Sequence, residues 1–503
     1  MVSLPFLPPS ASGYCYFSAL YVCIGSLLWG YDSGVFSTAQ AQTYFTYKFH
    51  PSPAVLGGII SIYTAGGAIG CLLSVPLGDR IGRRGTLGVG AIIAIIGTAL
   101  QTAAQEVVML VFGRLVAGLA IGIIYFAIPM FQSEIAPATH RGLFVGLHAQ
   151  FVGVGYMLSN WVGYGVSFSE GELPYRLSVG LQILWAIFLS GSIFLIPESP
   201  RYLIKKGRTE EAEIVMRRLR KSTSSQSTSP SPSPSHQNIE LEQMKSQIRW
   251  ESENEETALL AILRKPSYRR RIFLASGVQI AQQICGISAI NYYQTTMYRS
   301  LGIRDNHTVL LLAGIWGITG PLANIFCLAF IIDRVNRRTL LFWGSVGMTV
   351  DIIIVQVFVA VYGGEPDNKI ANAFGIFFLI LFGIIFSLSW NSGSPVYTTE
   401  VFPTQIRALG GGIATFWSFV VQVVLAQASP VGLGNVGWRY YFFFIACNLA
   451  IAVGVYVFLP ETKGKTLEEI SEIFGDVFVA GHMDGREKTR EEGVNVSWLQ
   501  LGC

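Results

Sequence analysis

Charged residues are scarce in this sequence, and their scarcity excludes a soluble protein. Asp, Glu, Lys and Arg make up 13% of the 503 residues, whereas soluble globular domains carry about 25%. Apolar residues make up 51% of the chain, which leaves too little polar surface to face water on all sides. We therefore expect a protein that lies in a lipid bilayer.

The residues that build enzyme and metal sites are also few. The seven cysteines are scattered without a C-x-x-C pair, which argues against both a disulfide framework and a metal site. The six histidines show no nucleophile or metal-ligand spacing, and the phosphate-binding pattern G-x4-G-K-[ST] is absent. The sequence therefore predicts no catalytic residue, no metal, no cofactor and no ATP-driven pump.

Long apolar runs, in contrast, are abundant. A helix needs about 20 apolar residues to cross a bilayer. A run of this kind, Leu340–Tyr362, is interrupted only by Asp351, and eleven others contain no charged residue. The eleven cover residues 1–31, 53–78, 85–105, 115–133, 142–169, 177–197, 272–298, 308–332, 370–399, 408–438 and 440–460. We therefore predict an all-α membrane protein with twelve transmembrane helices. The first run lacks the basic region and cleavage site of a signal peptide.

Lys and Arg are distributed unevenly between the two sets of loops. One set, which includes the middle loop and the C-terminal tail, holds 28 of them, and the opposite set holds six. Basic loops stay on the cytoplasmic side of a membrane. Both termini and the middle loop are thus expected in the cytoplasm. The positive net charge reflects this topology and gives no support to nucleic-acid binding.

The middle loop separates six spans from six. The predicted units are an N-terminal half at 1–196, a cytoplasmic middle loop at 197–271, a C-terminal half at 272–460 and a cytoplasmic tail at 461–503. The core of the loop, 222–235, is a low-complexity Ser/Pro segment that cannot form a packed core. Its flanks, 208–221 and 239–250, carry apolar residues at helical spacing, which predicts short amphipathic helices. A flexible tether throughout the loop is the alternative.

Three short patterns occur once in each half, at offsets of 254, 266 and 263 residues. They are D-R-x-x-R-R after the second and eighth spans (with V-N between the arginines in the second copy), P-x4-E-x6-R after the fourth and tenth, and P-E-[ST] after the sixth and twelfth. Duplicated halves are a transporter plan with the solute site near the midplane. Carboxylates and guanidiniums at such helix ends can form charge-assisted pairs, which predicts a cytoplasmic gate network. Its expected members are Asp79, Arg83, Glu134, Arg141, Glu198, Arg201, Asp333, Arg337, Glu400, Arg407 and Glu461. The alternative is that these residues are only basic anchors that orient the chain in the membrane, but this would not explain the matched spacing.

These patterns belong to a larger set of family motifs. The sequence resembles the sugar porters of the major facilitator superfamily, in particular their fungal members, over about residues 14–474. The resemblance implies two six-helix halves (the major facilitator fold), a monomer in the plasma membrane, and alternating access that moves a small polar solute. The motifs that carry it are G-Y-D-S-G-V at 30–35, G-D-R-I-G-R-R at 78–84, E-I-A-P-x-x-x-R-G at 134–142, P-E-S-P-R at 197–201, Q-Q-x-x-G-I at 282–287, E-x-F-P at 400–403 and P-E-T-K-G at 460–464.

Three charged residues lie well inside spans, where charge is expensive and is usually kept for function. In proton-coupled sugar porters an Asp of the first span faces an Arg of the fourth, and Asp32 and Arg114 match these positions. The resemblance thus implies protons as the coupling ion and sugar–proton symport. A static buried ion pair is the alternative, and facilitated diffusion also stays open, because the Asp occurs in facilitators. Asp351 is expected either to support helix packing or to face a cavity.

The seventh span carries the positions that bind hexose in the family. Gln282 and Gln283 match the sugar-binding glutamines, and amides offer both donors and acceptors to a polyhydroxylated solute. Gly286 allows the helix to break, and Tyr292 and Tyr293 match aromatic residues of the outer gate. The alternative is that the glutamines only join helices.

Five other site positions depart from the family. Ser288, Pro395, Ser418, Phe419 and Ala149 stand where the family has amides or an indole. Neighbouring polar and aromatic residues can refill part of the site. The expected substrate contacts are therefore Gln282, Gln283, Ser288, Asn291, Trp390, Asn391, Ser418, Phe419 and Gln150. Because sites built on hydrogen bonds discriminate sharply, the preferred solute should differ from glucose.

The sequence therefore predicts a secondary transporter of a sugar or sugar-like solute, and not an enzyme. A transporter of a quinate-like acid or a fungal metabolite on the same fold is the alternative. A transport-silent nutrient sensor is disfavoured because the tail is short and lacks a long signalling segment. Asn306 begins an N-x-[ST] sequon on the expected outer side and is a candidate glycosylation site, whereas the sequon at Asn495 is expected inside.

Overall fold

The computed structural model describes most of the chain. It covers residues 12–137, 141–220, 241–242, 244–246, 248–249, 262, 264–303, 305–332, 334–362, 368–403, 406–463, 470 and 473–474. The predicted loop core at 222–235, the side chain of Arg141, Asp333 and the sequon at Asn495 lie outside what is described.

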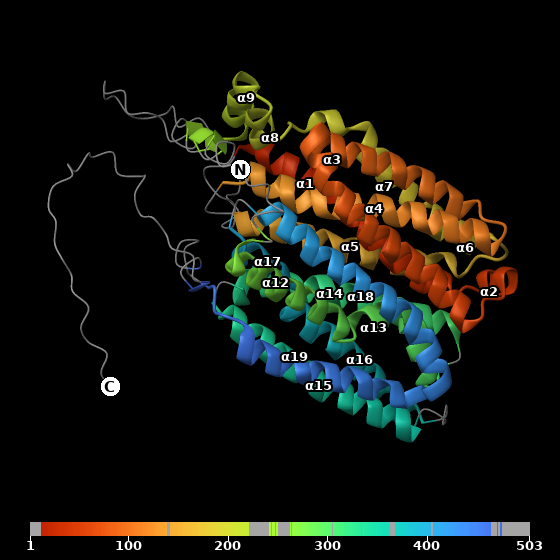
Figure 1. The fold of residues 1–503 in the computed structure, drawn as a ribbon. Helices are drawn as coiled ribbons and strands as arrows, with labels where there is room; N and C mark the ends of the chain where they lie inside the picture. Colours follow the sequence, from red (N-terminus) through yellow and green to blue (C-terminus); the bar gives the residue numbers. More distant parts are fainter. Residues whose placement is uncertain are drawn as a thin grey trace, which may run out of the picture.

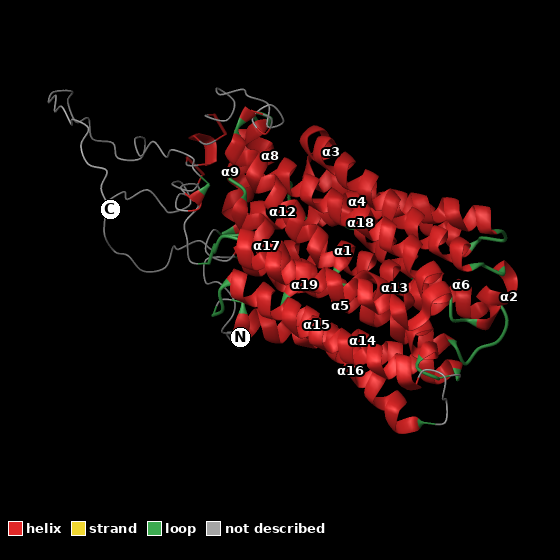
Figure 2. Cartoon of the chain, turned by 60° about the horizontal axis from the view of Figure 1, so that its bottom comes forward, coloured by secondary structure: helices red, strands yellow, loops and turns green. Residues whose placement is uncertain are grey.

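The described elements are helices joined by short loops (Figure 2). Those of the N-terminal half and the start of the middle loop are α1 (Gly13–Ala39), α2 (Thr43–Phe49), α3 (Pro53–Thr102), α4 (Val107–Ile135), α5 (Arg141–Val166), α6 (Leu173–Gly180), α7 (Gln182–Gly191), η2 (Ile193–Leu195), α8 (Pro200–Lys205) and α9 (Thr209–Leu219). Those of the C-terminal half are α12 (Pro266–Ile284), α13 (Ile287–Ser300), α14 (Asn306–Phe326), the π-helical turn η3 (Cys327–Ile331), α15 (Arg337–Tyr362), α16 (Lys369–Leu388), α17 (Trp390–Val401), α18 (Arg407–Val436), η4 (Gly437–Tyr440) and α19 (Tyr441–Phe458).

Nine segments within the described residues are long and apolar enough to cross a membrane. Two of them, Pro53–Thr102 and Leu409–Phe458, have 50 residues each. A straight helix of that length would measure about 75 Å, against about 30 Å for the hydrocarbon core, so each must contain two crossings. The chain turns at Gly82 (φ 82°) and at Gly437 (φ 54°). With the 26-residue helix α5, the segments agree with the twelve predicted spans.

The fold-back of α3 is visible in its packing against α4. Gly70, before the turn, and Gly90, after it, both lie against α4, so close that an added Cβ would collide with the carbonyl of Leu119 and with the side chain of Ile124, respectively. Small residues of this kind let helices approach closely in a membrane, where apolar burial gives little drive for association.

The two halves lie side by side, with α18 against α3 and α14 against α5 (Figure 1). Helices α8 and α9 lie at one end of the bundle together with Arg83 and Arg337, and we call this the basic end. Helix α2 lies at the other end, which we call the far end. Each half has its own apolar core, and a further cluster at the far end combines residues of both halves.

The first flank of the middle loop is helical, as predicted. Helix α9 buries Ala212, Met216 and Leu219 and is fastened to the N-terminal half, because the Arg220 side chain donates to the carbonyl of Ile135 at 2.8 Å. The described residues between 241 and 249, in the second flank, are helical as well. The flexible-tether alternative is therefore wrong for the first flank.

Candidate functional site

The seventh span breaks in the middle, as the position of Gly286 predicted. Helix α12 ends at Ile284 and α13 starts at Ile287, with Gly286 between them at φ 115°, a conformation that L side chains rarely adopt. The break leaves backbone groups without helical partners. One of these groups, the carbonyl of Cys285, accepts a hydrogen bond from the side-chain amide of Asn448 of α19 at 2.8 Å.

Four of the predicted substrate contacts lie beside this break. Gln283 donates to the Ser418 hydroxyl at 3.0 Å and accepts from the Ser288 hydroxyl at 2.6 Å. Gln282 accepts from Ser394 of α17 at 3.1 Å. Both glutamines are partly exposed within the bundle. An amide can donate two hydrogen bonds and accept two, so Gln283 keeps one donor and one acceptor for a ligand. We call these five residues the amide cluster.

A cavity of about 120 Å³ lies between the halves, next to the amide cluster along α13. Ala149, Gly153 and Tyr156 of α5 line one side. Asn291 and Asn391 line it from the C-terminal half, together with Trp316, Ser387 and Asn324. Gln282 and Gln283 do not line it. Its lining, apolar with a few convergent amides, is of the kind found in small-molecule sites.

Asn324 of α14 joins the polar side chains around this cavity. It donates to Gln150 at 2.9 Å and accepts from Asn391 at 3.3 Å and from Ser392 at 2.5 Å. Because Gln150 belongs to the N-terminal half, this chain of hydrogen bonds crosses between the halves. The sequence prediction did not include Asn324, although an amide within an apolar span was a signal that could have identified it.

The two predicted aromatic contacts lie in different surroundings. Trp390 is fully buried, and its indole N–H donates to the carbonyl of Leu341 and the hydroxyl of Ser345, both on α15. Phe419 of α18 packs across the halves instead, against Gly67 and edge-on to the ring of Tyr125 at 5.8 Å. The structure therefore brings Phe419 into the contact between halves and Trp390 into the core of one half.

Asp32 and Arg114 form the predicted pair inside the N-terminal half. The guanidinium donates to the Asp32 carboxylate at 2.9 Å, and the two residues are 2% and 0% exposed. The rings of Tyr63 and Phe36 lie 4.0 and 4.6 Å from the guanidinium carbon. Two nitrogens of Arg114, Nε and one Nη, have no hydrogen-bond partner. The pair is thus deeply buried, and its hydrogen-bonding groups are only partly satisfied. Removal of either charge would have a large effect on the stability of the fold.

The predicted gate tyrosines are buried at the far end, where α13 is hydrogen-bonded to the N-terminal half. Tyr292 donates to Gln422 at 3.1 Å and Tyr293 donates to the carbonyl of Ala426 at 2.6 Å. The carbonyl of Tyr292 accepts from Gln40, which directly follows α1, at 2.6 Å, and the carbonyl of Asn291 accepts from Tyr156 of α5 at 2.8 Å. These contacts close the far end over the cavity.

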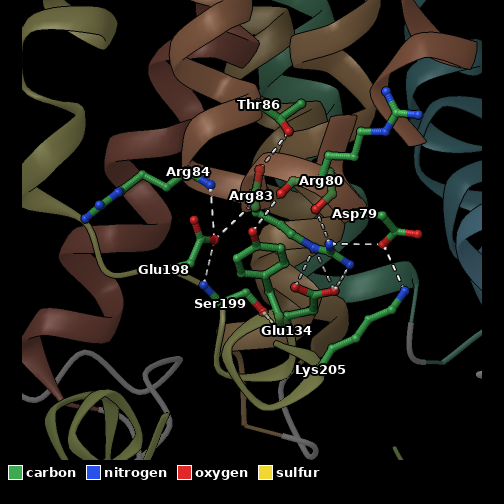
Figure 3. A network of polar contacts seen from close by, with 12 residues as sticks. Asp79, Arg80, Arg83, Arg84, Thr86, Glu134, Glu198, Ser199 and Lys205 are labelled. Carbon is green, nitrogen blue, oxygen red and sulfur yellow. Dashed lines mark hydrogen bonds and ion pairs between the residues drawn. The ribbon is translucent and has the colours of Figure 1, made fainter. Parts of the chain in front are cut away.

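At the basic end, the first copy of the repeated patterns forms one polar network (Figure 3). Arg83 donates to both oxygens of Glu134, at 2.9 to 3.2 Å, and to the carbonyl of Gly78 at 2.7 Å. Asp79 lies 3.5 Å from Arg83 and 3.3 Å from Lys205. Glu198 accepts from the backbone N–H of Arg83 at 2.9 Å. Burial raises the pKa of the Glu198 carboxyl, although backbone N–H groups favour its ionised form.

The second copy repeats this arrangement in the C-terminal half. Arg337 donates to Glu400 at 3.3 Å and to the carbonyl of Ile332. Glu461 accepts from the backbone N–H of Arg337 at 3.0 Å, as Glu198 does in the first half. Arg407, another predicted member, donates to the carbonyl of Phe402 at 3.1 Å. The repeats therefore place equivalent groups in equivalent positions, and these pairs join helices of the same half.

We expect the Arg83–Glu134 pair to stabilise the fold measurably. Both side chains are 8% exposed, so Glu134→Gln leaves a buried guanidinium without its counter-charge. This should lower the free energy of unfolding by about 3 kcal/mol. Asp79→Asn is the matched control. The Asp79 carboxylate is 47% exposed, so its loss should lower the free energy of unfolding by at most about 1 kcal/mol. Thermal unfolding of the purified protein in detergent compares the two. Equal midpoints for both variants would contradict the structural role of the buried pair.

Comparisons with known proteins agree with this fold. The profile of the family described as "Sugar (and other) transporter" matches residues 18–474. The chain is 33% identical to the MFS-type transporter criB of Aspergillus cristatus over 454 residues, which cover 90% of this chain and 92% of that one. It is 30% identical to a high-affinity glucose transporter of Kluyveromyces lactis over 480 residues, with 92% and 85% covered.

Solved structures show the same architecture. The structure of the proton:xylose symporter XylE with a bound 6-bromo-6-deoxy-D-glucose matches with a TM-score of 0.75 at 22% identity, over 92% of this chain and 99% of that one. The inward-open conformation of XylE from E. coli matches with a TM-score of 0.72, also at 22% identity, over 92% and 100%. At this identity the likeness establishes the fold.

Proposed function

The chain belongs to the sugar (and other) transporter family of the major facilitator superfamily, and we propose that it moves a small polyhydroxylated or carboxylated solute together with protons. The family consists of multi-pass membrane transporters and not of enzymes. The observation that carries the proposal is the broken seventh span, with the two glutamines of the amide cluster before Gly286 and the cavity-lining Asn291 and the buried tyrosines after it.

The solute would bind between the halves, in the cavity and against the amide cluster. Asn291, Asn391 and Asn324 offer amide groups there, and Gln283 keeps one donor and one acceptor free. Hydroxyl and carboxylate groups both pair with amides. Midplane binding beside a discontinuous helix is a general feature of secondary transporters, and the relative named as a glucose transporter supports a sugar-like solute.

Protons would act through the Asp32–Arg114 pair. When Asp32 takes up a proton, its attraction for Arg114 falls, because a neutral acid no longer offers a full charge. Helix α1, which carries Asp32 and is followed by Gln40, a donor to α13, could then change its position relative to α4. Proton binding and the state of the far end would thereby be linked.

Alternating access would follow from movement of the two halves around the cavity. Contacts from α13 to α1 and α5 close the far end, and they must break when that end opens. The repeated networks at the basic end connect helix ends within each half, which supports movement of residues 1–196 and 272–460 as two units, with 197–271 and 461–503 as connections.

We propose that the basic end faces the cytoplasm. The described chain begins and ends there, because Ser12 donates to Arg218 of α9 and Lys463 donates to the carbonyl of Arg334. Most Lys and Arg lie in the loops of this end, and basic loops remain cytoplasmic. We further propose the plasma membrane as the location and a monomer as the working unit.

This orientation predicts the fate of two sequons. Asn306, the first residue of α14 at the far end and partly exposed, should be the sequon that is accessible to glycosylation. Asn495, in the tail, should remain unglycosylated. Removal of sugars by a glycosidase, followed on a gel for wild type, Asn306→Gln and Asn495→Gln, measures this. A mobility shift that disappears in Asn495→Gln would reverse the topology.

The experiment that tests the proposed function is uptake of a panel of labelled solutes. Cells that lack their own sugar porters would express the protein, and uptake would be measured at two external pH values. The panel contains hexoses, pentoses, polyols, disaccharides and cyclic hydroxy acids. We expect uptake of at least one solute, faster at the lower pH. Equal rates at both pH values would support facilitated diffusion instead.

A further inference from the structure

A second carboxyl group lies deep inside the bundle, in the other half. Asp351 of α15 is 2% exposed, and neither of its carboxyl oxygens has a hydrogen-bond partner. Asp32, in contrast, has Arg114 at 2.9 Å. A buried ionised carboxylate without a partner is strongly disfavoured, and such a group takes up a proton instead.

Asp351 faces a small enclosed space. The cavity measures about 10 Å³, roughly the room that one water molecule needs. Residues from α13, α16 and α19 complete its lining, and apart from Asp351 and Tyr441 they are glycine or apolar side chains: Gly286, Ile290, Met297, Ile352, Val355, Leu379, Phe382 and Phe444. The phenol of Tyr441 also has no hydrogen-bond partner.

The chemistry of this cavity fits a proton better than a metal cation. Cations such as Mg²⁺ and Ca²⁺ require six or more oxygen ligands, and the lining offers one carboxyl group and one phenol. Among the lining residues, α19 contributes one titratable side chain, Tyr441, and α13 and α16 contribute none. The thiol of Cys285, next to Gly286, is turned to the carbonyl of Gln282.

The position of the cavity connects it to the broken span. Gly286 is both a lining residue and the break between α12 and α13. Gln282 and Gln283 of the amide cluster precede this break, and Tyr292 and Tyr293 follow it. Any rotation of α13 about Gly286 therefore changes the surroundings of Asp351.

We propose that Asp351 is a second proton-binding site, which holds its proton while the far end is closed and releases it when α13 moves. This proposal rests on the proposed proton-coupled transport for its role in the cycle. The binding of the proton itself can be tested without any solute. Asp32 and Asp351 would then be one proton site in each half, of which only the first has a paired cation.

Infrared spectroscopy of the purified full-length protein in lipid vesicles tests the proton site. At neutral pH we expect a C=O stretching band of a protonated carboxylic acid that shifts when aspartate is labelled with ¹³C. The band should remain in Asp32→Asn and be lost in Asp351→Asn. Wild type without a shifting band, or a band that persists in Asp351→Asn, overturns the proposal. The labelled Asp32→Asn protein gives an answer even if Asp351→Asn fails to fold, because Asp32 can no longer contribute to the band.

Spin labels at Tyr47 and Ile370 test the link to the far end. These side chains are 75% and 73% exposed and lie on different halves. In the Asp32→Asn background, lower pH should increase the fraction of molecules in which the two labels lie at the short distance of the closed far end. In Asp32→Asn/Asp351→Asn this pH response should be lost. A response that is equal in both, or absent from Asp32→Asn, overturns the proposal. A protein that transports nothing in the solute panel but shows both signals would refute the proposed function alone.

Discussion

Asp32→Asn should abolish accumulation of solute against its gradient while leaving exchange of solute across the membrane. The substitution keeps the shape of the side chain and removes the group that binds and releases a proton. The pair lies 2.9 Å apart and is buried, and of the ion pairs described for Arg114 this one alone is to a carboxylate. We expect the ratio of internal to external solute to fall to about one, measured with the best solute of the panel.

The matched control for this variant is Tyr63→Phe. The Tyr63 ring lies 4.0 Å from the Arg114 guanidinium carbon. Phe keeps the ring over the cation, so accumulation should be retained. If Asp32→Asn concentrates solute as well as wild type does, proton coupling through Asp32 is wrong. If exchange is lost as well, the pair serves the fold and not coupling.

Glucose should compete poorly for the solute site. Ser288, Pro395, Ser418, Phe419 and Ala149 stand at positions where sugar porters that this chain resembles hold a hexose. A lost hydrogen bond costs about 1 kcal/mol, and every 1.4 kcal/mol changes affinity tenfold. Loss of four such contacts would weaken hexose binding by nearly three orders of magnitude.

The structure adds a reason for this expectation. Ser288 and Ser418 do not simply leave space, because both are hydrogen-bonded to the Gln283 amide. The glutamine therefore has fewer groups free for a sugar. A pentose, polyol, disaccharide, cyclic hydroxy acid or fungal metabolite should displace the best labelled solute more effectively than glucose does.

Competition against that solute gives the measurement, with two variants for comparison. Gln282→Ala should weaken uptake, because it removes an amide of the cluster. Gln427→Ala is the matched control, since Gln427 is exposed at the far end and contacts Ser61 and the carbonyl of Ala54. High-affinity glucose uptake that is lost in Gln282→Ala would contradict the expectation and show that a hexose site survives.

Much of the scaffold could be predicted because its signals are local or repeated. Apolar runs without charge predicted the spans, and the helix break at Gly286 needs only the one residue that tolerates φ 115°. The matched offsets predicted charge-assisted pairs at equivalent helix ends of the two halves, and the structure places Arg83 against Glu134 and Arg337 against Glu400. The structure also pairs Asp32 with Arg114, and the role of this pair in coupling stays a prediction.

The organisation of the site could not be predicted in the same way, since it depends on which faces of distant helices meet. Asn324 joins Gln150 to Asn391 across 174 and 67 residues of sequence, and no local spacing indicates such contacts. Trp390 follows the break between α16 and α17, and that turn directs its indole to α15. Asp351 was visible as a charge in a span, but only the tertiary structure shows that it has no partner.

The most direct test of proton-coupled transport is proton movement that is driven by the solute alone. Purified protein in lipid vesicles, without any imposed pH gradient, would receive the best solute of the panel outside, while a pH-sensitive dye follows the medium. We predict that the medium becomes alkaline as solute enters, and that Asp32→Asn removes this signal. Uptake of solute by wild type without any change of external pH would contradict the mechanism.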